Sequence, residues 1–382
     1  MRPVAIIGVG MTPVGEHWDK SVRMLGAEAV QLALADAHLD AVEALYLGNS
    51  YGTTFSSQSH LGALVADYAG LGNIEAYAVE AGDASGGAAL RTGYLAVASG
   101  AVNFAMVVGA EKSSDAIGSS RVEGRNVSLD ADFESIHGAT LPALAAMIMR
   151  RYMYEYGVEL SAFEGFSINA HANGKRNSLA MYRNIIKAGA FAKAPFVSDP
   201  VNLFDGAPDA DGAAAVILAP LEWAMDRVSQ PIKIAGSGVA TDTLATHDRK
   251  DPLYLKAVAL SAQKALLQAG KTREEISFLE LHDAFTILTT LSLEALGYAD
   301  RGAGWRMTDK IGLTGELPIC TFGGLKSRGN PTGATGVYQA VEATLQLRGQ
   351  ANENQVNNAK SALIQNLGGF ATTAITHILE TL

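Results

Sequence analysis

The sequence of 382 residues contains only one cysteine, Cys320. A single cysteine excludes an intrachain disulfide and a cluster of thiolate ligands, so we expect a metal-free protein of a reducing, cytoplasmic compartment. No apolar run approaches the ~18 residues that a membrane span needs. The apolar start of the chain, residues 4–10, is too short for a signal segment and is interpreted as a buried strand.

Positive charge and aromatic side chains are also scarce. The chain carries 29 Lys and Arg against 39 Asp and Glu, a net charge of −10, and it has no basic block. This charge balance argues against a nucleic-acid partner. Aromatic residues make up 7% and apolar residues 48% of the chain, so the core is built mainly from Ala, Val, Leu and Ile. The length allows two domains, each with a full core.

Short β-rich segments alternate with alanine-rich helical segments, which predicts an α/β protein with a mostly parallel sheet covered on both faces. Five segments of the second half repeat, in order, five segments of the first half. This series predicts an internal duplication into halves of residues 1–230 and 231–382. The matched segments are 4–10 and 231–242, 22–37 and 255–270, 44–53 and 278–286, 85–100 and 330–349, and 104–112 and 361–370.

Residues 115–195 interrupt this alternation and are predicted to be an inserted loop region. Within it, Thr140 and Pro142 predict the start of an amphipathic helix, with Thr140 as its N-cap. Long insertions on an α/β scaffold often form binding loops or lids. Residues 197–220 then return to the first half and are expected to supply its last strand.

The stretch "VEAGDASGGAALRTG", residues 79–93, predicts a strand, a tight turn and a helix of small residues. Asp83 lies at the turn, where free backbone N–H groups favour an anion. Asp83 either caps the helix or is held at its tip and directed into a site. Gly86 and Gly87 beside it permit close approach of another group.

Three more segments place polar or glycine residues at equivalent strand ends, so they can converge with Asp83 on one pocket. In "ELHDAFT", His282 and Asp283 follow a buried strand, and as neighbours they are not expected to face the same site. The loop 321–336 is rich in glycine and turns at Asn330, and "QNLGGF" contributes Gly368 and Gly369. A surface histidine, an ordinary loop and a tight turn are the structural alternatives.

These segments resemble the motifs of the thiolase superfamily, in particular the archaeal and sterol-carrier-protein-type thiolases. "VEAGDASGGAALR", "ELHDAFT" and "GGLKSRGNPTGATG" are similar to the family's nucleophile turn, its "HDCF" element and its "GHP" loop. The resemblance covers essentially the whole chain. It implies a thiolase fold of two duplicated halves of mixed sheet covered by helices in αβαβα layers, a loop domain that helps to bind coenzyme A, and a homodimer or homotetramer.

The chain departs from this family at positions that perform the chemistry. Asp83 stands in place of the acylated cysteine and Asn330 in place of the basic histidine of "GHP", while Ala284 and Asn366 stand in place of further cysteines. A carboxylate is a poor nucleophile, and its acyl adduct would be a mixed anhydride that water destroys. An asparagine is no general base near neutral pH. The ordinary thiolase cycle is therefore predicted to be disabled.

By this resemblance, the chain keeps the family's hydrogen-bond donors and its ligand site. His282 is kept, and the turn with Gly368 and Gly369 would supply backbone donors near Asp83. For coenzyme A the candidates are His137, Met147 and Arg150 in the insertion, together with turns near Asp211. Arg150 and the next residue, Arg151, would either bind the phosphates of the nucleotide or solvate a helix face. No tightly bound cofactor is expected.

Three functions follow from this pattern. The first is non-covalent acyl-CoA chemistry, such as retro-aldol cleavage of a β-hydroxyacyl-CoA, with Asp83 as base and His282 and Asn330 polarising the thioester. The second is a non-catalytic acyl-CoA-binding subunit that assembles with an OB-fold and zinc-ribbon protein. The third is residual acetyl-CoA acetyltransferase activity in lipid metabolism. Cys320 is either a packed thiol, the default, or a substitute nucleophile.

Overall fold

The computed structural model describes all 382 residues. The strands are β1 (Val4–Met11), β2 (Ala44–Gly48), β3 (Glu75–Val79), β4 (Ala105–Glu111), β5 (Phe196–Ser198), β6 (Val201–Asn202), β7 (Gly212–Pro220), β8 (Ile232–Thr241), β9 (Phe278–Glu280), β10 (Ser361–Gly368) and β11 (Thr373–Glu380). The α-helices are α1 (Val22–Ala37), α2 (Gly52–Phe55), α3 (Leu61–Tyr68), α4 (Ser85–Ser99), α5 (Ser119–Arg125), α6 (Leu141–Tyr156), α7 (Glu164–Gly174), α8 (Leu221–Met225), α9 (Lys256–Ala269), α10 (Thr286–Ala295), α11 (Gly324–Ser327) and α12 (Thr335–Leu347). No helix among them has the length and apolar character to cross a membrane.

The main sheet has nine strands in the order β3-β2-β4-β7-β1-β8-β11-β10-β9. From the central pair β1 and β8, the order outward is β7, β4, β2, β3 on one side and β11, β10, β9 on the other. The two sides therefore repeat one topology, as expected of a duplicated chain. The place equivalent to β3 is taken by a single parallel bridge between Ile319 and Leu279.

The expectation of a mostly parallel sheet is wrong, and the mixed sheet of the thiolase fold is confirmed. Only the pairs β2–β3, β2–β4 and β9–β10 are parallel, and the other pairs are antiparallel. β10 and β11 are joined by the short turn 369–372, and such a connection forces neighbouring strands to run antiparallel. The alternation of helices and strands in the sequence does not show which strands become neighbours, so it does not fix whether neighbouring strands run parallel or antiparallel.

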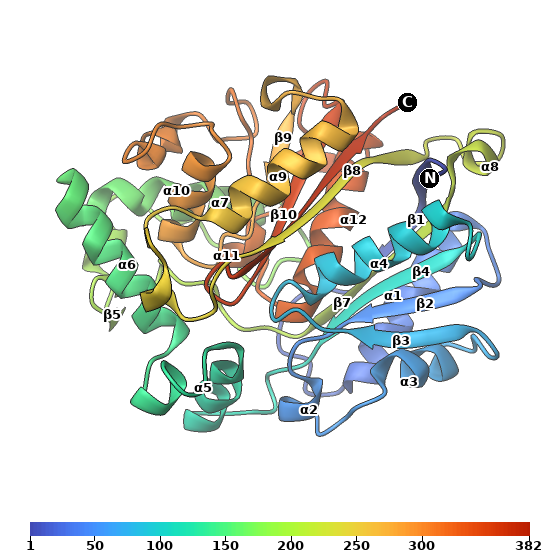
Figure 1. Ribbon diagram of the computed structural model, residues 1–382, viewed down its shortest axis with the longest axis horizontal. Helices are drawn as coiled ribbons and strands as arrows, with labels where there is room; N and C mark the ends of the chain where they lie inside the picture. The colour runs from blue at the N-terminus through green and yellow to red at the C-terminus, as the bar shows by residue number, and fades with distance from the viewer.

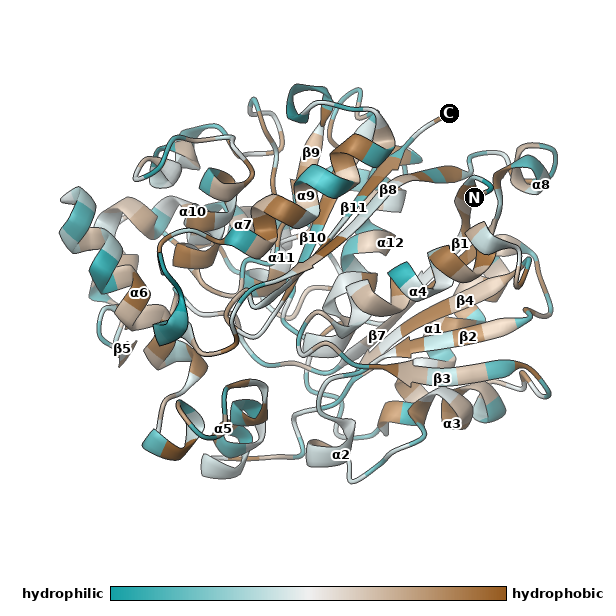
Figure 2. Cartoon of the chain, in the orientation of Figure 1, coloured by the Kyte–Doolittle hydropathy of each residue, from teal (hydrophilic) through white to brown (hydrophobic).

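Helices cover both faces of each half, so the molecule is layered (Figure 1). Figure 1 shows α4 and α12 side by side between the two halves of the sheet, and both belong to one central apolar cluster. α1 and α3 cover the outer face of the first half, and α9 and α10 that of the second. Along β1, Val4 and Ile6 face the central cluster while Ala5 and Ile7 face the outer one. In Figure 2, β4 is mostly hydrophobic, whereas hydrophilic segments lie on α6.

The close approach that Gly86 and Gly87 permit is made by protein and not by a ligand. A Cβ on Gly86 would lie 2.8 Å from the Gly333 carbonyl oxygen and 3.0 Å from the Gly336 nitrogen, next to α12. A Cβ on Gly87 would lie 3.0 Å from Oδ1 of Asn366. The two glycines therefore let α4 and α12 meet at their N-termini, where the candidate site lies.

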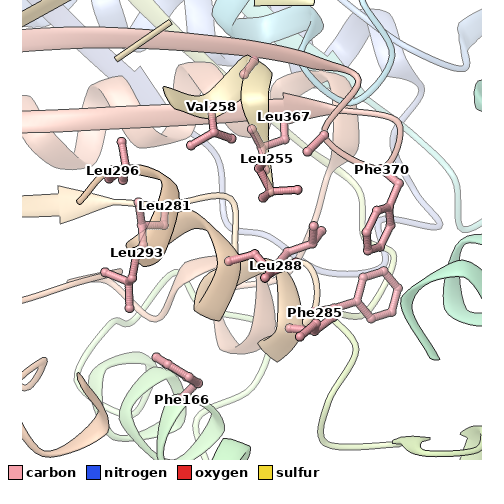
Figure 3. Packing of buried hydrophobic residues seen from close by; sticks show 14 of the residues in the cluster. Phe166, Leu255, Val258, Leu281, Phe285, Leu288, Leu293, Leu296, Leu367 and Phe370 are labelled. Atoms are coloured by element: carbon pink, nitrogen blue, oxygen red, sulfur yellow. The ribbon is translucent and has the colours of Figure 1, made fainter. Parts of the chain in front are cut away.

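The insertion packs against the second half. The predicted N-cap of α6 is confirmed, because Thr140 Oγ1 accepts a hydrogen bond from the Ala143 N–H at 3.3 Å. Apolar residues of α6 and α7 join the same cluster as α9, α10 and the end of β10. Figure 3 shows part of this cluster, with Phe285 beside Phe370 and Leu288 of α10 close to them, while Phe166 of α7 lies at its lower edge. The insertion thus forms a wall of the region between the two halves.

Candidate active site at the tip of helix α4

Asp83 is buried at the N-terminus of α4, with 4% of its surface exposed. Its carboxylate accepts a hydrogen bond from the Tyr51 hydroxyl at 2.7 Å and from two nitrogens of Arg125, Nη2 at 2.9 Å and Nη1 at 3.3 Å. Tyr51 follows β2, and Arg125 ends α5 in the insertion. Burial raises the pKa of Tyr51 well above its usual value, so the phenol remains a proton donor to the carboxylate.

Arg125 joins the helix tip to the cavity beside it. Its Nε lies 3.5 Å from Oδ1 of Asp209, and its guanidinium stacks over the Tyr51 ring at 4.8 Å from the centroid. Arg125 and Asp83 are both largely buried, so the ion pair is shielded from solvent. A buried carboxylate needs such a partner, because an unpaired charge is costly to remove from water.

His282 and Asn366 lie directly beside Asp83. Asn366 Nδ2 is 3.2 Å from the Asp83 carbonyl oxygen and 3.2 Å from His282 Nδ1. Burial lowers the pKa of His282 to about 4, with Arg125 and Arg328 acting in the same direction against the attraction of Asp83. The imidazole is therefore neutral near pH 7. Asp283, the next residue, points elsewhere, because its carboxylate accepts from the Leu325 N–H at 2.6 Å.

Asn330 is fixed with its amide nitrogen free. Its Oδ1 accepts a hydrogen bond from the Thr335 hydroxyl at 2.8 Å, and its backbone pairs with the strand-like segment at Asp209. The Nδ2 group has no acceptor within the protein, and Asn330 lines the adjoining cavity. It is thus a hydrogen-bond donor available to a ligand and has no capacity to remove a proton.

Backbone donors also surround the helix tip. In the turn before α4, the Ala84 and Ser85 N–H groups bond to Ala81 and Gly82, whereas the Asp83 N–H has no protein acceptor. The turn at Gly368 and Gly369 lies against it, since a Cβ on Gly82 would be 3.4 Å from the Gly369 nitrogen. Free backbone N–H groups at a helix N-terminus are suited to stabilising an oxyanion.

A cavity of about 930 Å³ adjoins this site. Its walls come from the insertion, from residues 182–209 and from the segment after β9, and they include Leu141, Ile185, Phe204 and Phe285. Arg125 and Asn330 line the cavity, but Asp83 and His282 do not. Arg125 therefore stands between the cavity and the Asp83 carboxylate.

Comparisons with known proteins identify the family. The thiolase N-terminal domain model matches residues 4–192, and the thiolase C-terminal domain-like model matches residues 238–381. An acetyl-CoA acetyltransferase of Methanothermobacter thermautotrophicus is 39% identical over 385 residues, which cover 100% of both chains. The chain belongs to the thiolase superfamily. The predicted family and fold class are thereby confirmed.

More distant relatives carry other names. Rat sterol carrier protein 2 is 28% identical over 98% of this chain and 71% of its own length. The benzoylsuccinyl-CoA thiolase subunit BbsB of Thauera aromatica is 28% identical over 93% of this chain and 91% of its own. A solved structure described as the Ltp2-ChsH2(DUF35) aldolase superposes with a TM-score of 0.86 at 25% identity, covering 99% of this chain and 98% of the other.

The residues suggested for coenzyme A lie in different surroundings in this thiolase homologue. His137 and Met147 are exposed and do not line the cavity. Arg150 forms an exposed ion pair with Asp199 at 2.8 Å, and Arg151 pairs with Glu155 along the face of α6. The turn that precedes Asp211, residues 206–209, does line the cavity.

Cys320 is a packed thiol. Its side chain is buried beside the Leu281 carbonyl oxygen, with Sγ at 3.7 Å, and it does not line the cavity. Burial raises the pKa of this thiol well above its usual value, and the nearby carboxylates of Asp283 and Glu280 raise it further. The thiolate needed for acyl transfer is therefore suppressed.

Sequence reasoning did not identify three important residues of this thiolase-type site: Tyr51, Glu111 and Arg125. One signal could have indicated Arg125: a buried Asp83 needs a cationic partner. Arg121 and Arg125 are basic residues one helical turn apart in the insertion, so they were candidates for that partner. Glu111, at the end of β4, accepts from the Ser50 N–H at 2.9 Å and from the Thr332 hydroxyl at 2.9 Å. It thereby ties the loop of Tyr51 to the loop that follows Asn330.

A second buried histidine gives a test of this packing. His377 Nε2 lies 3.2 Å from the Gly87 carbonyl oxygen, and burial lowers the pKa of His377 to about 4. Because the unfolded chain binds a proton near pH 6.5, the stability from neutral His377 is full above that pH and is lost as the pH falls toward 4. Between pH 7 and pH 4, wild type should lose about 3 kcal/mol of unfolding free energy relative to His377→Gln.

Denaturant unfolding of the two proteins over this pH range measures the difference. Burial raises the pKa of Glu111 to about 7, so this carboxylate changes the unfolding free energy with pH in the direction opposite to His377. Because wild type and His377→Gln share such carboxylates, their contribution cancels in the difference between the two proteins. A variant of the exposed His137 is the matched control. Parallel pH curves for wild type and His377→Gln would contradict a neutral, buried His377.

Proposed function

We propose that this thiolase homologue binds an acyl-CoA thioester in the 930 Å³ cavity and cleaves or forms a carbon–carbon bond without an acyl-enzyme, as in the retro-aldol cleavage of a β-hydroxyacyl-CoA. The observation that carries the proposal is the state of Asp83. The residue at the helix tip is a carboxylate held by Arg125 and Tyr51, while the donors around it remain free. This arrangement can stabilise an enolate but offers no sulfur for acylation.

The proton and electron balance of this cleavage needs no cofactor. The substrate hydroxyl gives its proton through Tyr51 to Asp83 as the Cα–Cβ bond breaks and the electron pair moves onto the thioester oxygen. His282 and Asn330 would donate hydrogen bonds to that oxygen. The same proton then returns to Cα, and the products are a shorter acyl-CoA and an aldehyde or ketone. Arg125 has to move for the substrate to reach Asp83.

The names of two similar proteins support parts of this proposal. The structural neighbour at 25% identity is described as an aldolase that includes a DUF35 component. The Methanothermobacter thermautotrophicus relative, at 39% identity, is named an acetyl-CoA acetyltransferase, and this name supports a coenzyme A thioester as the ligand proposed for this chain. We therefore propose coenzyme A thioesters as ligands and an OB-fold and zinc-ribbon protein as a partner, within cytoplasmic lipid metabolism.

Self-association belongs to the same proposal. β3 is the edge strand of the sheet, its side chains are partly exposed, and Tyr77 has 45% of its surface exposed. An unpaired edge of this kind is a template for a second strand. We propose that a second copy pairs there to form a homodimer, which sedimentation of the purified chain would test.

The experiment that tests the function is a cleavage assay on the full chain, alone and with a co-expressed DUF35-type partner. The probes are 3-hydroxybutyryl-CoA and a tertiary 3-hydroxyacyl-CoA, with the acetyl-CoA product measured by mass spectrometry. We expect acetyl-CoA from at least one probe and no detectable thiolysis of acetoacetyl-CoA by free CoA. Thiolysis without hydroxyacyl cleavage would reject the proposal.

A second candidate function is favoured by one observation. Asp83 and His282 do not line the cavity, so a ligand could occupy it without meeting them. This position suits a non-catalytic acyl-CoA-binding subunit of a larger complex. Binding of acyl-CoA with no cleavage, with or without the partner, would favour this function over catalysis.

A further inference from the structure

The orientation of the Asn366 amide is fixed by two backbone groups. Asn366 is fully buried at the end of β10. The Gly87 N–H can only donate, so the atom that lies 3.0 Å from it is the oxygen, Oδ1. The Asp83 carbonyl can only accept, so the atom that lies 3.2 Å from it is the nitrogen, Nδ2. A flipped amide would place two donors together and two acceptors together.

This orientation decides which nitrogen of His282 carries the proton. Asn366 Nδ2 has two hydrogens, one for the Asp83 carbonyl and one for His282 Nδ1 at 3.2 Å. Nδ1 must therefore be the acceptor of a neutral ring, and the proton lies on Nε2. Neutrality agrees with the burial of His282, which is the main cause that lowers its pKa; Arg125 and Arg328 act in the same direction and Asp83 acts against them.

The proton on Nε2 has no acceptor within the protein, although His282 is only 2% exposed. Nε2 is therefore available as a hydrogen-bond donor to a ligand. We propose that Asn366 is a positioning residue that locks His282 as a neutral imidazole protonated at Nε2, so that His282 is a fixed hydrogen-bond donor and not a proton-transfer group. That the accepted atom is a thioester oxygen rests on the proposed function.

The lock assigns the proton transfers of the reaction to other residues. Neither an amide nor a neutral imidazole whose lone pair is already bonded to Asn366 removes a proton from a substrate. On the proposed function, Asp83 and Tyr51 therefore move the proton, and His282 only donates a hydrogen bond. A β-hydroxyacyl thioester suits this division, since its cleavage begins with loss of the hydroxyl proton and creates an enolate for the His282 donor to stabilise.

Nitrogen NMR of the full-length protein labelled with ¹⁵N-histidine tests the lock without any activity. His282→Asn assigns the signals, and wild type should show unprotonated Nδ1 and protonated Nε2 from pH 5 to 8. In Asn366→Asp the carboxylate would accept from Nδ1–H, so the tautomer should reverse and the midpoint of the His282 titration should rise by about 1–3 pH units. Asn366→Leu, similar in volume, should leave a mixture of tautomers.

Protonated Nδ1 in wild type, or unchanged tautomer and titration in the folded Asn366 variants, would overturn the proposal. If Asn366→Asp does not fold, Asn366→Leu and wild type still decide it. A confirmed tautomer without hydroxyacyl cleavage would reject the proposed function and leave the lock intact.

Discussion

Replacing Asp83 by alanine should reduce the rate of hydroxyacyl-CoA cleavage by about 10²–10⁴-fold, the usual contribution of a general base. Asp83→Asn should lose activity to a similar degree, because an amide keeps the shape and the contacts with Tyr51 but takes no proton. The measurement is kcat for the 3-hydroxyacyl-CoA that wild type cleaves, together with acyl-CoA affinity by calorimetry.

The control separates chemistry from folding and binding. Asp132→Ala removes an exposed carboxylate from the same insertion that carries Arg125, and it should leave kcat within twofold of wild type. Affinity for acyl-CoA should change little in Asp83→Asn, since Asp83 does not line the cavity. Full activity in Asp83→Ala would show that the carboxylate has no part in the reaction.

The second large effect concerns stability. Arg125→Met should lower the free energy of unfolding by about 3–5 kcal/mol, because it leaves the buried Asp83 carboxylate without its cation. The direct contacts are the Nη2–Oδ2 distance of 2.9 Å and the Nη1–Oδ1 distance of 3.3 Å. Urea unfolding followed by circular dichroism measures the change.

The double variant Asp83→Asn/Arg125→Met is the matched control. It removes both charges at once, and buried pairs replaced as a whole by neutral groups are often tolerated with little loss. The double variant should therefore be more stable than Arg125→Met alone. Single variants that each cost less than about 1 kcal/mol would place this pair among weak surface interactions and would contradict the buried site.

The duplication and the position of Asp83 could be predicted because both are written in local patterns. Residues 44–53 and 278–286 share one order of apolar and polar residues, and each became a strand followed by a loop at the site. Residues 79–93 likewise predict a helix tip, because a strand is followed there by a glycine, an aspartate and a run of small residues. Strand direction has no such local signature, so the mostly parallel sheet was a wrong expectation.

The partners of Asp83 could not be predicted in the same way. Arg125 is 42 residues and Asn366 is 283 residues from Asp83 in the chain, and no periodicity links them. The same holds for the neighbours of Gly86 and Gly87. The sequence shows that these residues are small, but it does not show that helix α12 packs against them. The candidates His137, Met147 and Arg150 remain predictions, because the structure places them outside the cavity and no ligand contact tests them.

The amino-acid sequence was enough to place this protein among duplicated α/β chains of the thiolase type and to place a carboxylate, Asp83, at the tip of a helix of small residues. Residue identity and order are enough for that conclusion, since they fix both hydrophobic pattern and the chemistry of each side chain. The three-dimensional fold was needed to show that Arg125 pairs with that carboxylate, that Tyr51 donates a hydrogen bond to it, and that Asn366 lies against His282. Hydrogen bonds and ion pairs act over about 3 Å, and the fold alone brings residues so distant in sequence within that range.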